Sequence, residues 1–171
     1  NVYAADIPDP ETFFGHKPGA DFKLIRWEKI VEYYQLLGRE SNRINVEELG
    51  KTTLENPFIL AVISSPENLS QLEKYKEIAK KLAQGRVSEE EAGSLAKEGK
   101  TIVLITGSMH AAECGPTQMS PELGYVLATD DSPEIKSILD NVIFLLGPSW
   151  NPDGNIMVVD WYRRSVGTPY G

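Results

Sequence analysis

Two short segments carry the side chains best suited to chemistry, and each follows a predicted strand. In the first, residues 107–113, His110 stands three residues before Glu113. A neutral imidazole nitrogen and a carboxylate oxygen are both good zinc ligands. The spacing therefore permits one shared metal ion. A histidine near a glutamate is also common as a surface or capping pair, and two ligands fall short of the three at a typical catalytic zinc.

The second segment is Asn151-Pro152-Asp153-Gly154, which follows the apolar run 142–146. In open α/β sheets, binding sites form just beyond the carboxyl ends of the central strands. We therefore expect the two segments to lie at the same edge of one sheet. The same residue types are also favoured in an ordinary turn, each for its own backbone reason, so the motif alone does not separate a site from a turn.

Cys114 directly follows Glu113 and lies four residues after His110. A nucleophilic cysteine needs a base, and the base needs a third group to orient it. The sequence offers no such third group, and a lone cysteine usually packs as a small hydrophobic residue. A single cysteine also excludes an internal disulfide framework and a multi-cysteine metal cage. We therefore expect a packing role for Cys114.

Hydrophobic periodicity places these segments in an α/β fold. Residues 1–22 are rich in Pro, Gly and Asp and predict an irregular arm. Helices are expected over 26–38 (ending at Gly38), 65–85, 88–99, 116–128 and 132–140. Strands are expected over 44–49 and 58–63, paired as a hairpin around 52–57, and over 101–106 and 142–146. The last two runs are continuously apolar, which favours parallel strands at the sheet centre, with 101–106 buried on both faces.

Length and charge narrow the classes of partner. The chain has 171 residues, one domain or most of one, with 17 Lys and Arg against 25 Asp and Glu and a net charge of −8. Nucleic acid and anionic membranes would repel such a surface, so neither is expected as a partner. No apolar run approaches the ~20 residues that span a bilayer.

The pattern Gly107-x-x-His110-x-x-Glu113 after one apolar strand, with Asn151-Pro152-Asp153-Gly154 after the next, resembles the carboxypeptidase A-like zinc carboxypeptidases. The resemblance implies a three-layer α/β/α fold with a mixed, centrally parallel sheet. It also implies that His110 and Glu113 are two of the three ligands of one Zn²⁺ ion. Arg163, in the segment Trp161-Tyr162-Arg163-Arg164, best matches the family's arginine that polarises the scissile carbonyl, with Arg164 as the fallback. Asn151, Arg163 and Arg164 are then the expected substrate contacts, and Trp161 and Tyr162 line a substrate cleft or pack in the core.

The sequence also departs from the family pattern. Residues 65–100 form a helical insertion where the family has a short connection, and Cys114 stands where the pancreatic-type enzymes have tryptophan. The third zinc ligand, the general-base glutamate and the carboxylate-binding pair are expected downstream of Gly171. Residues 1–171 are therefore expected to be the amino-terminal, incomplete part of one catalytic domain, which by itself binds zinc weakly or not at all and does not turn over peptide.

The leading functional hypothesis is a zinc-dependent exopeptidase of the carboxypeptidase type, acting on a peptide substrate. A second is a zinc-dependent deacylase or amidase acting on small acyl-amino acids or cell-wall peptides. A third is a non-catalytic binding module on the same fold. The acidic chain begins at Asn1 rather than methionine and resembles secreted peptidases, which favours a secreted or periplasmic location.

Overall fold

A mixed four-stranded sheet organises the protein, whose computed structural model describes residues 7–170. The strands are β1 (Ile44–Lys51), β2 (Pro57–Ile63), β3 (Thr101–Thr106) and β4 (Val142–Gly147), in the spatial order β1-β2-β4-β3. β2 is antiparallel to both of its neighbours, whereas β3 and β4 are parallel. The hairpin and the mixed α/β sheet are confirmed, with the parallel pair at one end of the sheet.

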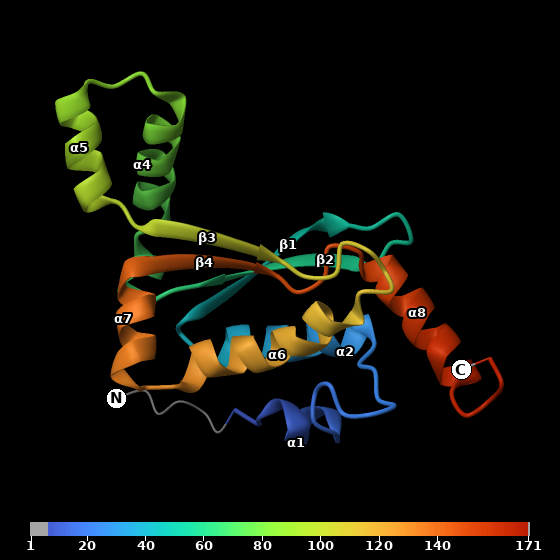
Figure 1. The fold of residues 1–171 in the computed structure, drawn as a ribbon. Coiled ribbons are helices and arrows are strands. Elements are labelled where there is room, and N and C mark those ends of the chain that lie inside the picture. The colour runs from blue at the N-terminus through green and yellow to red at the C-terminus, as the bar shows by residue number, and fades with distance from the viewer. Residues whose placement is uncertain (1–6, 171) are drawn as a thin grey trace.

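Helices α2 (Trp27–Glu40), α6 (Cys114–Thr129) and α7 (Pro133–Asn141) cover one face of this sheet, and α1 (Pro10–Phe14) packs on the outer side of α2 and α6 (Figure 1). They enclose the main hydrophobic core, in which Trp27, Tyr34 and Leu37 of α2 are fully buried. Full burial of an apolar side chain of this size contributes roughly 1.5–3 kcal/mol. The Tyr34 hydroxyl also donates to the Ser120 carbonyl (2.7 Å), which ties α2 to α6.

Two details of this layer differ from the sequence prediction. Helix α2 continues past Gly38 to Glu40. A Cβ at Gly38 would lie 3.1 Å from the Val46 side chain, so the glycine permits close packing of α2 on β1 rather than ending the helix. The arm 1–22, of which residues 1–6 lie outside the described part, is not wholly irregular. It contains α1, whose Phe13 and Phe14 rings pack on Tyr33.

The opposite face is covered at one end only, by α3 (Pro66–Ser70), α4 (Leu72–Gln84) and α5 (Glu89–Glu98). Figure 1 shows α4 and α5 above the amino-terminal end of β3, far from α8. The single helix predicted over 65–85 is interrupted at Gln71, which has non-helical backbone angles. The buried Asn68 amide donates to carbonyls of α7, which anchors α3 separately from α4. The α/β/α layering is thus confirmed.

Strand β3 is not buried on both faces as predicted. Within residues 7–170 it pairs only with β4, and Ile102, Leu104 and Ile105 are 43%, 56% and 38% exposed. An apolar run indicates a strand, but its burial depends on which elements flank it, and α4 and α5 leave even its first residues, Thr101 and Ile102, exposed. The chain therefore presents an apolar, uncharged sheet edge.

Helix α8 (Pro152–Ser165) was not predicted from the sequence. The Asn-Pro-Asp-Gly motif, interpreted as a turn, is the start of this helix, with Asn151 as its N-cap and Pro152 in the first turn. An N-cap asparagine, a proline at the first position and arginines in the last turn are the ordinary signals of a helix. No helix within residues 7–170 is long and apolar enough to cross a membrane.

Candidate active site

The loops that follow β3 and β4 interlock at the carboxyl ends of these parallel strands. The Gly107 amide donates to the Gly147 carbonyl (2.8 Å), and the Trp150 amide donates to the Gly107 carbonyl (2.6 Å). A Cβ at Gly107 would lie 2.5 Å from a backbone carbonyl oxygen, so only glycine permits this approach. The backbone therefore holds residues 107–113 beside residues 147–154.

The His110 and Glu113 side chains meet on the first of these loops. His110 Nδ1 lies 2.8 Å from Glu113 Oε1 and, because a carboxylate only accepts, carries the donated proton. The His110 backbone amide donates to Glu113 Oε2 (3.3 Å). The ring hydrogen bond, followed by the amide, holds the pKa of Glu113 below its usual range. Both side chains are open to solvent, at 75% and 56% exposed.

Glu113 occupies the N-cap position of α6 but does not cap the helix. Its side chain makes no hydrogen bond to the amides of the first turn, and its backbone angles (φ −83°, ψ 65°) are not helical. The carboxylate is directed back toward His110 instead. The interpretation of this histidine and glutamate as a capping pair therefore has no support in the geometry.

The pair fits two positions of a zinc site. Zinc bonds to nitrogen and carboxylate oxygen are about 2.0–2.2 Å long, so two ligands of one tetrahedral ion lie about 3.3–3.5 Å apart. His110 Nδ1 and Glu113 Oε1 are 2.8 Å apart, so they would have to move roughly half an ångström further apart to bind a shared ion. Within the described part of the chain, no group of three or more His, Cys, Asp or Glu side chains could hold a metal. The two donors are thus chemically suitable for zinc, but a third ligand is missing among the described residues.

Ser108 stabilises the same loop, although it was not predicted from the sequence as a functional residue. Its side chain is 6% exposed, and its φ of 43° lies in the left-handed region that L-residues rarely adopt. Its hydroxyl donates to the Glu113 carbonyl (2.5 Å) and accepts from the Thr117 amide (3.1 Å). A serine at a predicted strand end was the only sequence signal.

Asn151 connects the second loop to the first. Its Oδ1 accepts from the Gly154 amide (2.9 Å), which caps α8, and its Nδ2 donates to the Met109 carbonyl (3.3 Å) beside His110. The predicted substrate contact is thus also a structural link between the loops.

Asp153 attaches the start of α8 to the turn of the β1–β2 hairpin. Its carboxylate accepts from the Thr52 hydroxyl (2.5 Å), the Asn56 amide group (2.8 Å) and the Leu54 backbone amide (3.1 Å). Burial raises the pKa of Asp153, but these three hydrogen bonds outweigh burial and leave the pKa below its usual range. In the sequence, Asp153 stands out only as part of a motif, and its role in holding the start of α8 to the hairpin turn was not predicted.

Arg163 and Arg164 lie in the last turn of α8, apart from the pair. With a rise of 1.5 Å per residue, the Cα of Arg163 lies about 18 Å along the helix from that of Asn151. The Arg163 guanidinium donates to the Leu24 carbonyl (3.3 Å). The structure therefore brings Asn151 to the His110 loop and pairs Arg163 with the Leu24 carbonyl at the other end of α8.

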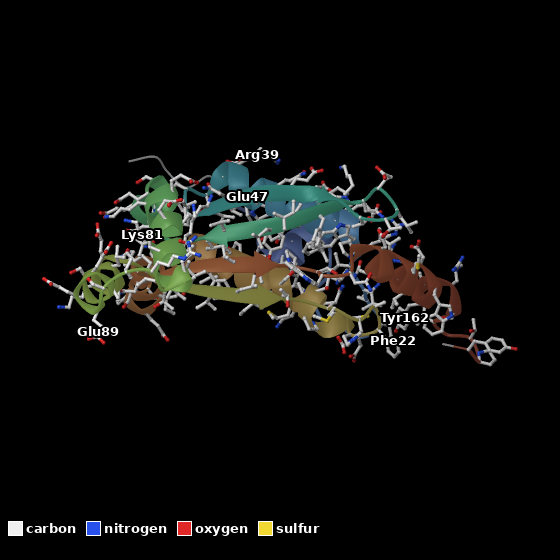
Figure 2. All side chains as sticks on the ribbon, turned by 90° about the horizontal axis from the view of Figure 1, so that it is seen from above. Phe22, Arg39, Glu47, Lys81, Glu89 and Tyr162 are labelled. Atoms are coloured by element: carbon white, nitrogen blue, oxygen red, sulfur yellow. The ribbon has the colours of Figure 1, made fainter. Side chains whose placement is uncertain are left out.

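A cavity of about 660 Å³ lies between residues 18–24, α6 and α8, and Ala112 forms part of its wall. Trp161 and Tyr162 line it, so they border a cavity and do not belong to the hydrophobic core. Figure 2 shows Phe22 and Tyr162 close together at this end of the molecule. Because Ala112 lies between His110 and Glu113, the cavity begins next to the paired donors.

Cys114 also lines this cavity and is half-buried. Its Sγ approaches the Ala111 carbonyl at 3.8 Å, and burial raises the pKa of the thiol. The thiolate, rather than the thiol, is the nucleophile. The environment of Cys114 therefore disfavours the reactive form and fits the predicted packing role.

The mixed sheet and its flanking helices define an α/β protein, and comparison with known proteins identifies the family. A family model described as zinc carboxypeptidase matches residues 30–166. The chain belongs to the zinc carboxypeptidase family, which confirms the resemblance inferred from the motifs. No match was found among curated proteins.

Two solved structures show the same fold. Carboxypeptidase A from Helicoverpa armigera is 19% identical with a TM-score of 0.56 over 86% of this chain. Thrombin activatable fibrinolysis inhibitor is 11% identical with a TM-score of 0.57 over 95% of this chain. At these identities the likeness concerns the fold alone. The chain spans 27% and 32% of the length of these two proteins.

Proposed function

We propose that this chain carries the first two metal ligands of a zinc-dependent carboxypeptidase-type exopeptidase. The observation that supports this most directly is the 2.8 Å approach of His110 Nδ1 and Glu113 Oε1 at the carboxyl end of β3, in a chain that belongs to the zinc carboxypeptidase family. In the proposal, the third ligand and the general base come from sequence beyond Gly171, and residues 1–171 form the amino-terminal part of the catalytic domain, with 65–100 as an insertion.

A bound zinc ion supplies Lewis-acid chemistry, because it polarises a carbonyl group and lowers the pKa of water. The residues of this chain prepare two of its ligands. The hydrogen bonds from His110 lower the pKa of Glu113, which favours the charged carboxylate that a metal requires. His110 Nδ1 donates to that carboxylate, and a metal ion bound between the two atoms would replace the shared proton. Neither side chain is committed to packing or to capping a helix, so both are free to turn toward an ion.

The substrate contacts follow from the same geometry. Asn151 borders the loop that carries His110 and is proposed to contact the substrate near the reacting bond. Arg163 and Arg164 stand beside Trp161 and the cavity at the other end of α8. We propose that they contact a part of the peptide remote from the metal. A role for Arg163 at the carbonyl would require its guanidinium to leave the Leu24 carbonyl.

The test compares hydrolysis by the intact parent protein with that of two histidine variants. C-terminal residue release from a peptide panel is measured for wild type, His110→Ala and His16→Ala, before and after chelation and zinc addition. His16 is the matched control, because it is the other histidine and lies in the amino-terminal arm, where it contacts the Lys17 carbonyl. We expect loss of activity in His110→Ala alone, and zinc-dependent recovery in the other two proteins.

The same assay separates the alternatives. Hydrolysis of N-acyl amino acids or cell-wall peptides without release from ordinary peptides would favour the deacylase or amidase. Retained peptide affinity without any hydrolysis would favour the binding module. Normal turnover by His110→Ala would contradict the ligand assignment. A secreted or periplasmic location belongs to the same proposal, and cell fractionation tests it.

A further inference from the structure

The first hydrogen bond of α6 is built differently from those of other helices in this chain. In α5, α7 and α8, the amide four residues after the capping residue donates directly to the capping carbonyl, at 2.8, 3.0 and 3.0 Å. In α6 the equivalent groups are the Thr117 amide and the Glu113 carbonyl. They are joined through the hydroxyl of Ser108, which accepts from the first and donates to the second.

This bridge fixes the backbone of Glu113. The Glu113 carbonyl is held by the hydroxyl of a residue five positions earlier in the same loop, rather than by an amide of α6. With its backbone held in this way (φ −83°, ψ 65°), Glu113 directs its carboxylate toward His110 and away from the first turn of α6. The hydroxyl has one proton and uses it on the Glu113 carbonyl, so the bridge has a defined direction.

The backbone of Ser108 is held in a sparsely populated conformation to make the bridge. Its φ of 43° disfavours any side chain with a Cβ, and glycine would adopt it more readily. A serine here therefore carries a conformational penalty that the buried hydroxyl offsets. Strained backbone that persists in a folded protein is often associated with a functional site.

We propose that Ser108 is the positioning residue of the metal pair. By bonding to the Glu113 carbonyl and the Thr117 amide, its hydroxyl fixes the Glu113 backbone so that the carboxylate lies against His110. This inference rests on the proposed function for its metal readout, while its conformational readout needs no metal. Without the hydroxyl, the Glu113 backbone loses this restraint and its carboxylate leaves His110.

The test uses this chain with Ser108→Gly, which removes the hydroxyl and relieves the positive φ, so that the fold is retained. Ser120→Ala is the matched control. Ser120 is also buried in this region, and its hydroxyl donates to the Thr117 carbonyl (3.0 Å) without touching the loop. The first readout is solution NMR without metal, which follows the His110 Nδ1 hydrogen bond and the backbone shifts of Glu113. The second is titration with Zn²⁺ alone, followed on the His110 ring resonances.

We expect Ser108→Gly to lose the imidazole–carboxylate hydrogen bond and to show changed backbone shifts at Glu113, with thermal stability near that of wild type. Zinc affinity should fall about 10–100-fold, the range seen when a group that orients a metal ligand is removed. Ser120→Ala should retain both signals. Ser108→Gly with an intact hydrogen bond and wild-type zinc affinity would overturn the proposal. If wild type showed no saturable zinc binding at His110, as expected of a chain without the third ligand, the NMR readout alone would decide the role of Ser108.

Discussion

The imidazole Nδ1 of His110 lies 2.8 Å from the carboxylate of Glu113, although Glu113 stands at a position from which a side chain ordinarily caps the following helix. Helix-capping residues satisfy amides that otherwise lack partners. The Glu113 side chain does not bond to those amides and instead accepts a hydrogen bond from His110 in the same loop. This relationship is the observation on which the proposed metal pair rests.

Gln118 should be essential for stability, because it fastens Ile25, which directly follows residues 18–24, to α6. Its Oε1 accepts from the Ile25 amide (2.6 Å) and its Nε2 donates to the Ile25 carbonyl (2.9 Å), all in a buried setting. Gln118→Ala leaves the Ile25 amide and carbonyl without hydrogen-bond partners, which costs about 1–3 kcal/mol for each group. Urea unfolding should show a loss of about 2–4 kcal/mol, whereas the exposed Gln84→Ala should stay within about 0.5 kcal/mol.

Asp153 should make the stability of the β1–β2 turn depend on pH. Its pKa is lowered in the folded state by three hydrogen bonds that exceed the effect of burial. A depressed carboxyl pKa contributes stability that is present above the unfolded value, near 3.8, and is lost as the pH falls through the folded value. Thermal unfolding of wild type should therefore weaken below about pH 4.

In Asp153→Asn, this acid-dependent component should be absent, and the variant should be less stable than wild type at pH 7, because it loses a charged acceptor. Equal slopes of melting temperature against pH between pH 2 and 4 in both proteins would show that the carboxylate does not carry the effect.

Arg163 should act on substrate binding. It lies about 18 Å along α8 from Asn151 and donates to the Leu24 carbonyl at the cavity. Arg163→Ala in the intact parent should therefore raise KM and change kcat little, which is the pattern of uniform binding. Arg164→Ala provides the comparison. A loss of about 10²–10³ in kcat at constant KM would instead support the role at the developing oxyanion that the family resemblance implies.

The edge of β3 should make this chain prone to self-association. Ile102 and Leu104 are exposed on an uncharged strand, and unprotected edges of this kind pair with other chains. Leu104→Lys places a charge at a half-exposed position, so light scattering of concentrated samples should fall while the melting temperature stays nearly constant. Ile63→Lys, at a fully buried position of β2, should abolish folding. Unchanged scattering by Leu104→Lys would locate the association elsewhere.

Sequence reasoning found the donor pair and the sheet because their signals are local. The spacing of His110 and Glu113 after an apolar strand, and the helical spacing of Trp27, Tyr34 and Leu37, are readable without knowledge of tertiary contacts. The zinc carboxypeptidase resemblance then added the family, which the comparisons confirm.

The misses have physical causes of two kinds. Strand β3 was expected to be buried because an apolar run predicts a strand but not what flanks it. Helix α8 was overlooked because the residue types that start a helix, here at Asn151, are shared with turns. Ser108 was missed because its role depends on a hydroxyl that joins residues five and nine positions away in a fold unknown at that stage.

The most direct measurement of the central claim is anomalous diffraction at the zinc absorption edge from crystals of the intact parent protein grown with Zn²⁺. The account predicts a peak bonded to one imidazole nitrogen of His110 and to a Glu113 carboxylate oxygen, each about 2.0–2.2 Å away. The peak should be absent from crystals of His110→Ala. Zinc bound only at other residues, with the His110–Glu113 hydrogen bond undisturbed, would contradict the assignment.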